Sequence, residues 1–279
     1  MKYIKDYQAT AKEMKNWIKN QMELAHAEDA FLGVSGGTDS LVVGKLLMDA
    51  IGPEHVYGIF MPNGEQKDFM DAVLAAETIG IRADRRITSN LALSVFAAEN
   101  TICLATGREF MKKAAKINVV PRVRTAIEYG IAQEMSDHSI VICTANLSEL
   151  AMGYFTMWAD MGSLCPLGNL TKTEVRQLGL ALGLPEKLVL KTPADGLSEM
   201  TDEEKLGFKY SAIDAVIRGD LESVSEGTAM AIRDRIKKME FKAKMLNIPS
   251  FVPQLVFKDI ADKEDTIGYT ANGNPPAAE

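Results

Sequence analysis

Strand-like and helix-like segments alternate along the first half of this chain, and this alternation restricts the fold more than any other feature. The strand-like segments cover residues 30–35, 55–62, 84–89 and 139–146, and the second and fourth are almost continuously apolar. Strands of a parallel sheet that is covered on both faces have this composition. The pattern predicts an α/β fold with a doubly wound, mainly parallel sheet and helices on both of its faces.

Helical patterns separate the strands and dominate the second half of the chain. We expect helices over residues 4–27, 38–50, 65–79, 122–135, 170–185, 210–218 and 227–246. Residues 153–169 form instead a loop rich in glycine and aromatic residues, long enough to carry a function. The stretch 248–279 is rich in Pro, Gly, Asn and charged residues. We expect it to be a partly disordered tail that follows one domain, residues 1–247.

The charge balance and the cysteine content exclude several classes of function. The 279 residues carry a formal net charge of −7. We expect no nucleic-acid or membrane partner, because both require a basic face. We also expect no membrane span and no signal segment, since no stretch approaches the roughly 18 apolar residues of a span. The three cysteines, Cys103, Cys143 and Cys165, lack metal-ligand spacing, which favours a reducing, cytoplasmic setting.

Residues 31–47, FLGVSGGTDSLVVGKLL, place six loop residues between an apolar strand and a helix. One interpretation is the serine elbow of the α/β-hydrolases, because GVSGG matches G-x-S-x-G. That enzyme class needs an acid and then a histidine after the serine. The only histidines are His26, His55 and His138, and none lies in the last half of the chain. We therefore reject this interpretation.

A phosphate-binding loop is the second interpretation of SGGTDS. Gly36 and Gly37 would let the backbone approach an anion closely, and the following helix begins with free N–H groups. The lysine of the G-x-x-x-x-G-K-[ST] loop is missing, so this is not a kinase-type phosphate loop. Asp39 would repel a phosphate unless a cation lies between them, and we interpret it as a Mg²⁺ ligand. The alternative is a plain turn with Asp39 as a first-turn helix carboxylate.

The same six residues carry a resemblance to a known superfamily. SGGTDS resembles the SGGxDS pyrophosphate loop of the N-type ATP pyrophosphatases, whose fold is adenine nucleotide alpha-hydrolase-like. Residues 118–133, 142–156, 166–197 and 201–214 resemble segments of one member family, ammonia-dependent NAD synthetase. The similarity extends from about residue 28 to residue 245. It implies a mainly parallel, five-stranded sheet followed by C-terminal helices.

This resemblance implies an amide synthetase that uses ATP and Mg²⁺. In that family a carboxylate attacks the α-phosphate of ATP, pyrophosphate leaves, and ammonia then displaces AMP. The implied acid is the nicotinate carboxylate of deamido-NAD, and the product is NAD. No glutaminase region accompanies the synthetase-like one, so free ammonia would be the nitrogen donor. The family also implies a homodimer. The apolar face of the 122–135 helix (Val123, Ile127 and Ile131) is compatible with a dimer and equally with core packing.

The resemblance also implies roles for individual residues. Asp39 and Glu149 would hold Mg²⁺, and Lys172 would pair with the phosphates as a point charge, so these three form the catalytic set. The residues that would bind ATP are Gly33, Val34, Ser35, Gly36, Gly37, Thr38, Asp39, Ser40, Thr144 and Lys172. The residues that would bind the acid substrate are Arg122, Tyr154, Phe155, Asp160 and Lys242.

Each of these assignments has a simpler alternative. Glu149 could be an ordinary carboxylate at a helix N-terminus, and Lys172 a solvated helix residue. Tyr154 and Phe155 could be plain core or loop packing.

The chain departs from the family pattern where the acid substrate should bind. A lysine expected after GYFT is Met157, and the histidine of a His-Lys pair is Phe241. The segment 157–164 is one residue shorter, and Ala194 replaces a hydroxyl residue. Each lost polar contact costs on the order of 1–3 kcal/mol. Two further hypotheses therefore stay open: an adenylating amide synthetase for a different carboxylic acid, and a non-catalytic nucleotide-binding protein.

Overall fold

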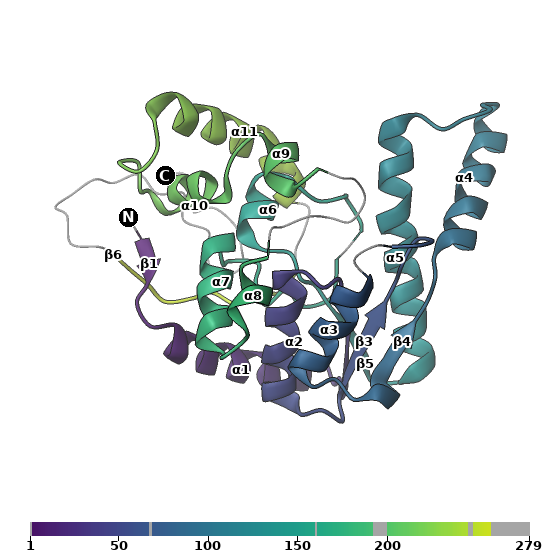
Figure 1. Ribbon diagram of the computed structural model, residues 1–279, viewed down its shortest axis with the longest axis horizontal. Coiled ribbons are helices and arrows are strands. Elements are labelled where there is room, and N and C mark those ends of the chain that lie inside the picture. Colours follow the sequence, from purple (N-terminus) through teal and green to yellow (C-terminus); the bar gives the residue numbers. More distant parts are fainter. Residues whose placement is uncertain (1, 67–68, 160, 192–199, 245–247, 258–279) are drawn as a thin grey trace.

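The computed structural model describes residues 2–66, 69–159, 161–191, 200–244 and 248–257 (Figure 1). In chain order its elements are β1 (Lys2–Ile4), α1 (Tyr7–Leu24), β2 (Asp29–Gly33), α2 (Thr38–Ile51), β3 (Val56–Phe60), α3 (Phe69–Ile79), β4 (Arg86–Thr88), α4 (Ala92–Thr106), α5 (Lys113–Met135), β5 (Ser139–Ile142), α6 (Leu147–Ala151), α7 (Lys172–Ala181), α8 (Glu186–Val189), α9 (Asp202–Leu206), α10 (Tyr210–Arg218), α11 (Glu226–Lys244) and β6 (Leu255–Phe257). A 3₁₀ turn, Ala83–Arg85, precedes β4. Each predicted strand and helix is present. None of the helices in the described ranges combines the length and the apolar character needed to cross a bilayer.

Within the described ranges, the central sheet has four parallel strands in the order β4-β3-β2-β5. Ala30 of β2 pairs with Val56 of β3 and with Ile140 of β5. The implied five-stranded sheet is therefore wrong for this part of the chain. Beyond β5, the described residues contribute only two isolated parallel bridges, between Ile142 and Leu164 and between Cys165 and Ser250. The backbone of the loop that carries Leu164 lies directly against the backbone of β5. A Cβ on Gly162 would lie only 2.5 Å from the carbonyl carbon of Ile142.

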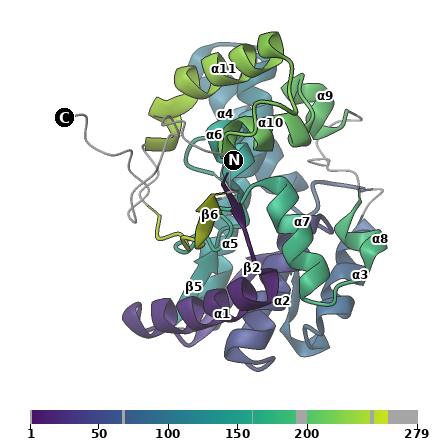
Figure 2. The ribbon, with the colours of Figure 1, turned by 90° about the vertical axis from the view of Figure 1, so that its left-hand side faces the viewer.

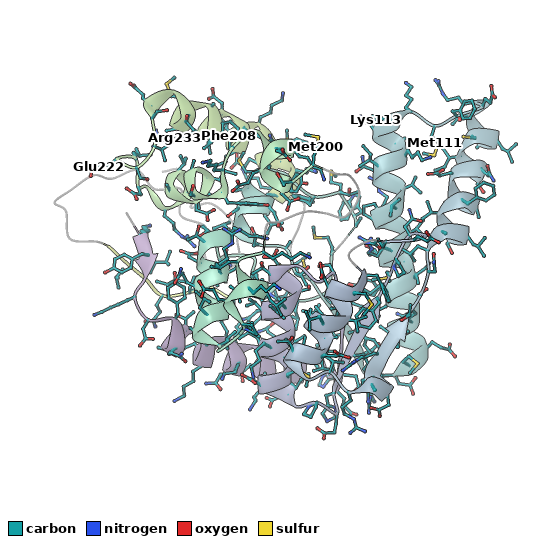
Figure 3. All side chains as sticks on the ribbon, viewed as in Figure 1. Met111, Lys113, Met200, Phe208, Glu222 and Arg233 are labelled. Carbon is teal, nitrogen blue, oxygen red and sulfur yellow. The ribbon has the colours of Figure 1, made fainter. Side chains whose placement is uncertain are left out.

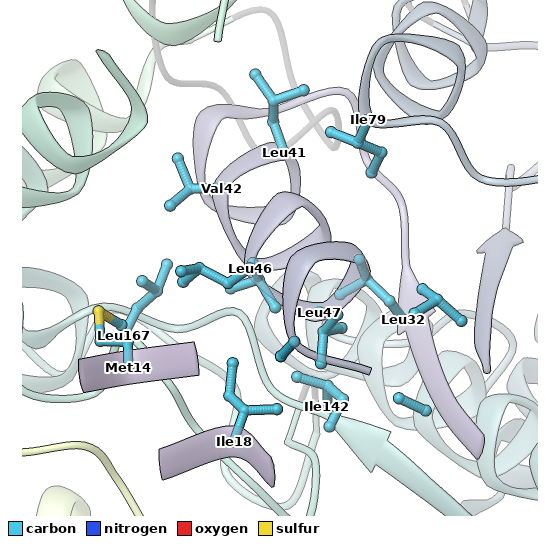
Figure 4. Packing of buried hydrophobic residues seen from close by; sticks show 14 of the residues in the cluster. Met14, Ile18, Leu32, Leu41, Val42, Leu46, Leu47, Ile79, Ile142 and Leu167 are labelled. Atoms are coloured by element: carbon cyan, nitrogen blue, oxygen red, sulfur yellow. The ribbon is translucent and has the colours of Figure 1, made fainter. Parts of the chain in front are cut away.

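Helices cover both faces of the central sheet, which confirms the doubly wound prediction (Figure 1). On one face, α1, α2, α3 and α7 share a core with the inward residues of the strands. Figure 4 shows Leu46 of α2 and Ile18 of α1 among its members. On the other face, α4 and α5 pack around the stacked rings of Phe31 and Tyr57, whose centroids lie 4.4 Å apart. Apolar strands buried between two helical layers account for the continuous apolar runs in the sequence.

Helices α6, α9, α10 and α11 form a third core of their own. Met152, Tyr210, Ile213 and Ile232 are among its buried residues, and they come from the region of α6 and from α10 and α11. Figure 1 shows this group at the upper left, above α7. The predicted C-terminal helices are thus a separate packed layer beside the sheet.

A second, two-stranded sheet joins the two ends of the described chain. β1 and β6 pair antiparallel, with Ile4 opposite Leu255, and lie side by side in Figure 2. Phe251 is buried and its ring meets Trp17 of α1 edge-on, with centroids 6.1 Å apart. Residues 248–257, the described part of the expected tail, therefore belong to the folded unit. The rest of that tail lies outside the described residues.

Helix α5 begins at Lys113, well before the start predicted at Arg122. Pro121 lies inside the helix. Because proline has no backbone N–H to donate, it usually marks a helix start, and this is why the sequence predicts a start just after it. The helix continues through it because Val119 and Val120, just before the proline, are buried against the sheet. Tertiary packing thus overrides the local signal.

The strand order creates a switch point between β2 and β5. The chain proceeds from β2 to β3 and β4 in one direction and then returns to place β5 on the other side of β2. In open α/β sheets, ligands bind outside the carboxyl ends of the strands where this order reverses. The loops that follow β2 and β5 lead into α2 and α6, whose first turns carry Asp39 and Glu149, and both residues are thereby directed to the same place.

Candidate active site

The SGGTDS loop connects β2 to α2 and is shaped by its own hydroxyl groups. The Oγ atoms of Ser35 and Ser40 lie 3.2 Å apart, and the N–H of Gly37 donates to Ser35 Oγ at 3.2 Å. Gly37 is the N-cap of α2, so the first turn of this helix opens toward the loop. The hydroxyl of Ser35 thus contacts the hydroxyl of Ser40 and not the histidine that a hydrolase nucleophile requires. This agrees with the rejection of a hydrolase elbow.

Gly36 is required by two features of the loop. Its φ of +76° lies in the left-handed region, which favours glycine. A Cβ at this position would also lie 2.7 Å from the backbone nitrogen of Ala72, in the first turns of α3. The loop and α3 are thus packed backbone to backbone, and this contact holds the SGGTDS turn in place.

The three residues of the predicted catalytic set meet at one point. The Lys172 ammonium donates to Asp39 Oδ2 and lies 3.6 Å from Glu149 Oε1. Lys172 is the first residue of α7 and is only 2% exposed. The interpretation of Lys172 as a solvated helix residue is therefore wrong. Three residues from three different elements, α2, α6 and α7, converge at the switch point of the sheet.

Asn146 is a site residue that the sequence reasoning does not identify. Its side-chain nitrogen donates to Asp39 Oδ1 at 3.1 Å, while its side-chain oxygen caps α6 by accepting from the N–H of Glu149 at 3.1 Å. Glu149 Oε2 in turn accepts from the N–H of Asn146, which completes a capping box. Glu149 is thus both a helix-capping carboxylate and a member of the convergent group. The signal for Asn146 is the Asn-x-x-Glu spacing of residues 146–149.

The electrostatics of the group keep Lys172 charged and make Glu149 titratable near neutrality. Burial alone would lower the pKa of Lys172, but the carboxylates of Asp39 and Glu149 raise it above the usual lysine value. Burial, and then the negative charge of Asp39, raise the pKa of Glu149 to about 7. Part of the protein population therefore carries a protonated Glu149 at neutral pH, until a cation binds.

The carboxylates of Asp39 and Glu149 fit a Mg²⁺ ion. Both offer oxygen atoms to the same ammonium nitrogen, so they already enclose a cation. In the part of the chain that the structure describes, no group of three or more His, Cys, Asp or Glu residues could hold a metal. Two carboxylates suffice for Mg²⁺ when phosphate oxygens and water supply its other ligands. The arrangement therefore suits a metal that arrives with a nucleotide.

The other residues predicted to contact ATP lie around Asp39, Glu149 and Lys172, and they differ in how far their side chains are buried. Gly33 ends β2, and Thr144 is half-buried between β5 and α6. The side chain of Val34 lies in the core, and the Thr38 hydroxyl donates to the Val189 carbonyl at 2.9 Å, which anchors α8. For Val34 and Thr38, only backbone atoms can face a nucleotide, because their side chains are engaged elsewhere.

The predicted substrate contacts form a second group along residues 153–159. The Lys242 ammonium donates to the Gly153 carbonyl at 2.7 Å and lies 4.2 Å from the ring centroid of Phe155. Arg122, exposed on α5, donates from Nε to the Met157 carbonyl at 3.2 Å. Basic side chains from α5 and α11 thus hold this loop from two sides. Asp160, the remaining predicted contact, lies outside the described residues.

Tyr154 has a packing role, as its simpler interpretation proposes. Its side chain packs against the third core, and its hydroxyl donates to Asp202 Oδ1 at 3.0 Å. Of the two altered positions, Met157 presents its carbonyl to Arg122, and the side chain of Phe241 is 60% exposed on α11.

The fold and the convergent residues define a class of protein. It comprises α/β proteins of the adenine nucleotide alpha-hydrolase-like fold that place an SGGxDS loop at the switch point of a parallel sheet. Within this class the chain belongs to the NAD synthase family, which residues 10–246 match. The NH₃-dependent NAD⁺ synthetase of Carboxydothermus hydrogenoformans is 36% identical over 253 residues, covering 90% of this chain and 99% of that relative. The resemblance found in the sequence is therefore confirmed.

Solved structures of the same family have similar folds. An NMN synthetase from Francisella tularensis is 28% identical, with a TM-score of 0.73 over 88% of this chain and 99% of that chain. An NAD⁺ synthetase from Burkholderia pseudomallei is 25% identical, with a TM-score of 0.71 over 86% of this chain and 91% of that one.

Proposed function

We propose that this protein amidates the nicotinate carboxylate of deamido-NAD with ammonia, consuming ATP and producing NAD, AMP and pyrophosphate. The observation that carries this proposal is the convergence of Asp39, Glu149 and Lys172 beside the SGGTDS loop. Relatives that match nearly the whole chain are NH₃-dependent NAD⁺ synthetases, which supports the same substrate.

The reaction divides into two displacements that this site can position. The acid oxygen attacks the α-phosphate of ATP, and the bond to the β-phosphate oxygen breaks to release pyrophosphate. Ammonia then attacks the activated carbonyl, loses a proton, and the bond to the AMP oxygen breaks. Lys172 is placed to balance negative charge on the leaving pyrophosphate, since its ammonium lies at the N-terminus of α7 beside the phosphate loop. Little side-chain acid or base chemistry is needed, because alignment and charge stabilisation carry both steps.

Asp39 and Glu149 are the residues that would hold Mg²⁺. When bound, Mg²⁺ supplies Lewis-acid stabilisation of the phosphate oxygens. Around it, Asn146 orients the carboxylate of Asp39 and caps the helix that carries Glu149. These hydrogen bonds fix both carboxylates before a nucleotide arrives.

The predicted products give a direct test of the proposed function. Purified protein with ATP, Mg²⁺, ammonium and deamido-NAD should form NAD and pyrophosphate in equal amounts. A parallel reaction with nicotinate mononucleotide tests the activity that the name of the Francisella protein states. ATP bound without pyrophosphate release would support a non-catalytic protein and overturn the proposal.

The raised pKa of Glu149 predicts how Mg²⁺ dependence varies with pH. Only the ionised carboxylate binds the metal, so protons compete with Mg²⁺ below a pH of about 7 and cease to compete above it. The half-saturating Mg²⁺ concentration, corrected for ATP protonation, should be about tenfold higher at pH 6 than at pH 8. Steady-state kinetics at both pH values measure it. Equal half-saturation at both pH values would contradict the assignment, and Glu149→Gln should lose the pH dependence.

We also propose that the protein is a homodimer that pairs through α4. The apolar face of α5 is not free to form a dimer interface, because its residues Val123, Ile127 and Ile131 pack against the second core. Helix α4 and the start of α5 stand apart from the helices at upper left, and Figure 3 labels Met111 and Lys113 where α4 joins α5. The large apolar side chains exposed along this region are Leu93, Phe96, Ile102, Leu104, Phe110 and Ile117. A patch of this kind marks an interaction surface.

A charge on α4 should separate the proposed dimer. Leu104 is 84% exposed, so Leu104→Asp should leave the fold intact and shift the protein to monomer in sedimentation analysis. Leu24→Asp is the matched control, because Leu24 is 74% exposed at the end of α1. A Leu104→Asp protein with the sedimentation coefficient of the control would contradict the proposed interface.

A further inference from the structure

Helix α10 carries two buried polar side chains one helical turn apart. Tyr210 is 1% exposed and Asp214 is 5% exposed. Residues four apart share a face of a helix, and α10 packs against both α6 and α7. This face of α10 therefore meets the two helices that carry Glu149 and Lys172.

Asp214 uses both of its carboxylate oxygens to join α6 and α7. Ser148 Oγ donates to Asp214 Oδ1 at 2.5 Å, and the N–H of Thr173 donates to Asp214 Oδ2 at 2.7 Å. The Ser148 hydroxyl also accepts from the N–H of Lys172 at 2.9 Å. One carboxylate thus links the first turns of α6 and α7. It accepts directly from Ser148 of α6 and from Thr173 of α7, and Ser148 in turn accepts from the N–H of Lys172.

The residues in this network are the chain neighbours of the catalytic set. Ser148 directly precedes Glu149, and Thr173 directly follows Lys172. A shift at Ser148 or at the N-terminus of α7 would therefore move the side chains that converge on Asp39. The anion also lies where a helix dipole favours negative charge, at the N-terminus of α7.

The chemistry of the Asp214 site indicates a function beyond stability. Its partners are a hydroxyl and a backbone amide, and burial raises the pKa of Asp214 while these hydrogen bonds oppose the rise. A buried carboxylate held by neutral donors is expensive for the fold, and buried carboxylates with a shifted pKa cluster at functional sites.

Tyr210 extends the same contact to the tip of Lys172. The Lys172 ammonium lies 5.4 Å from the centroid of the Tyr210 ring, within the range of a cation–π contact. Helix α10 therefore reaches Lys172 in two ways. Asp214 connects to the backbone N–H of Lys172 through Ser148, and the Tyr210 ring lies near the Lys172 ammonium.

We propose that Asp214 is a positioning residue of this reaction: through Ser148 and Thr173 it fixes Glu149 and Lys172 so that both meet Asp39. This inference rests on the proposed function and adds to it a residue that touches neither ATP nor the acid substrate.

Asp214→Asn tests the inference, with Asp234→Asn, an exposed site on α11, as the matched control. The asparagine has one acceptor oxygen in place of two, so its NH₂ group would face either the Ser148 hydroxyl or the N–H of Thr173. We expect kcat for pyrophosphate release to fall about 10- to 100-fold and the half-saturating Mg²⁺ concentration to rise about tenfold. The control should match the unmodified protein. A fall in kcat without a shift in Mg²⁺ half-saturation would assign Asp214 a merely structural role and overturn the proposal.

Ser148→Ala provides a second route to the same conclusion, also if Asp214→Asn fails to fold. It should shift Mg²⁺ half-saturation in the same direction. The double variant should be no worse than Asp214→Asn, since both changes remove one shared contact. Additive losses, or an unshifted Ser148→Ala protein, would contradict the proposal. Absence of pyrophosphate release by the unmodified protein would overturn the proposed function, whereas pyrophosphate release that Asp214→Asn and Ser148→Ala leave unchanged would overturn this inference alone.

Discussion

Asp39→Asn should lower kcat for pyrophosphate release by about 10³-fold, which is the loss expected when a major charge-stabilising group is removed. The substitution keeps the shape of the side chain and its contact with Asn146. It removes the negative charge that would hold Mg²⁺ and that faces the Lys172 ammonium. The loss should therefore appear in kcat and in Mg²⁺ dependence, while the fold stays intact.

Asp49→Asn is the control for this change, because it makes the same substitution near the far end of the same helix. Asp49 pairs with Lys45, and both side chains are about a third exposed. An exposed pair of this kind contributes roughly 0–1 kcal/mol, so activity should be unchanged. Retention of more than about a tenth of kcat in Asp39→Asn would show that the SGGTDS loop works without a metal carboxylate.

Lys172→Met should abolish turnover and also destabilise the protein. The methionine fills the buried space but leaves the carboxylates of Asp39 and Glu149 facing one another without a cation. Removing one partner of a buried ion pair costs roughly 3–5 kcal/mol. Because Mg²⁺ can replace the lost positive charge, it should raise the melting temperature of this variant more than that of the unmodified protein.

Thermal unfolding with and without Mg²⁺ measures this effect. Lys45→Met is the control, since it removes a lysine of an exposed pair and should alter the melting temperature little. A Lys172→Met protein that is as stable as the control and gains nothing from Mg²⁺ would contradict the placement of a cation between these carboxylates.

The sequence predicts the parts of the fold and site that depend on local pattern. Continuous apolar runs identify the buried strands, and the SGGTDS loop, through its glycines and helix start, predicts a phosphate site that includes Asp39. The roles expected for Glu149 and Lys172 come from the family resemblance of the segments that contain them. The family resemblance implies one strand too many, because the loop beside β5 contributes only isolated bridges among the described residues.

The residues that the sequence does not reveal act through contacts between distant segments. Asn146 meets Asp39 across 107 positions of the chain, and Asp214 meets Ser148 across 66. No spacing rule predicts which buried polar residue of one helix will face another helix. The same holds for the exposed apolar side chains of α4. They are exposed because α4 stands apart from the other helices, which its composition does not reveal.

The central claim is that this site activates a carboxylate at the α-phosphate of ATP before ammonia attacks it. Deamido-NAD labelled with ¹⁸O in its nicotinate carboxylate tests this claim in a single turnover experiment with mass analysis of the products. We predict one ¹⁸O atom in AMP for each NAD formed, because the acid oxygen that attacks phosphorus leaves with AMP. Unlabelled AMP, with the ¹⁸O in inorganic phosphate or water, would contradict the account.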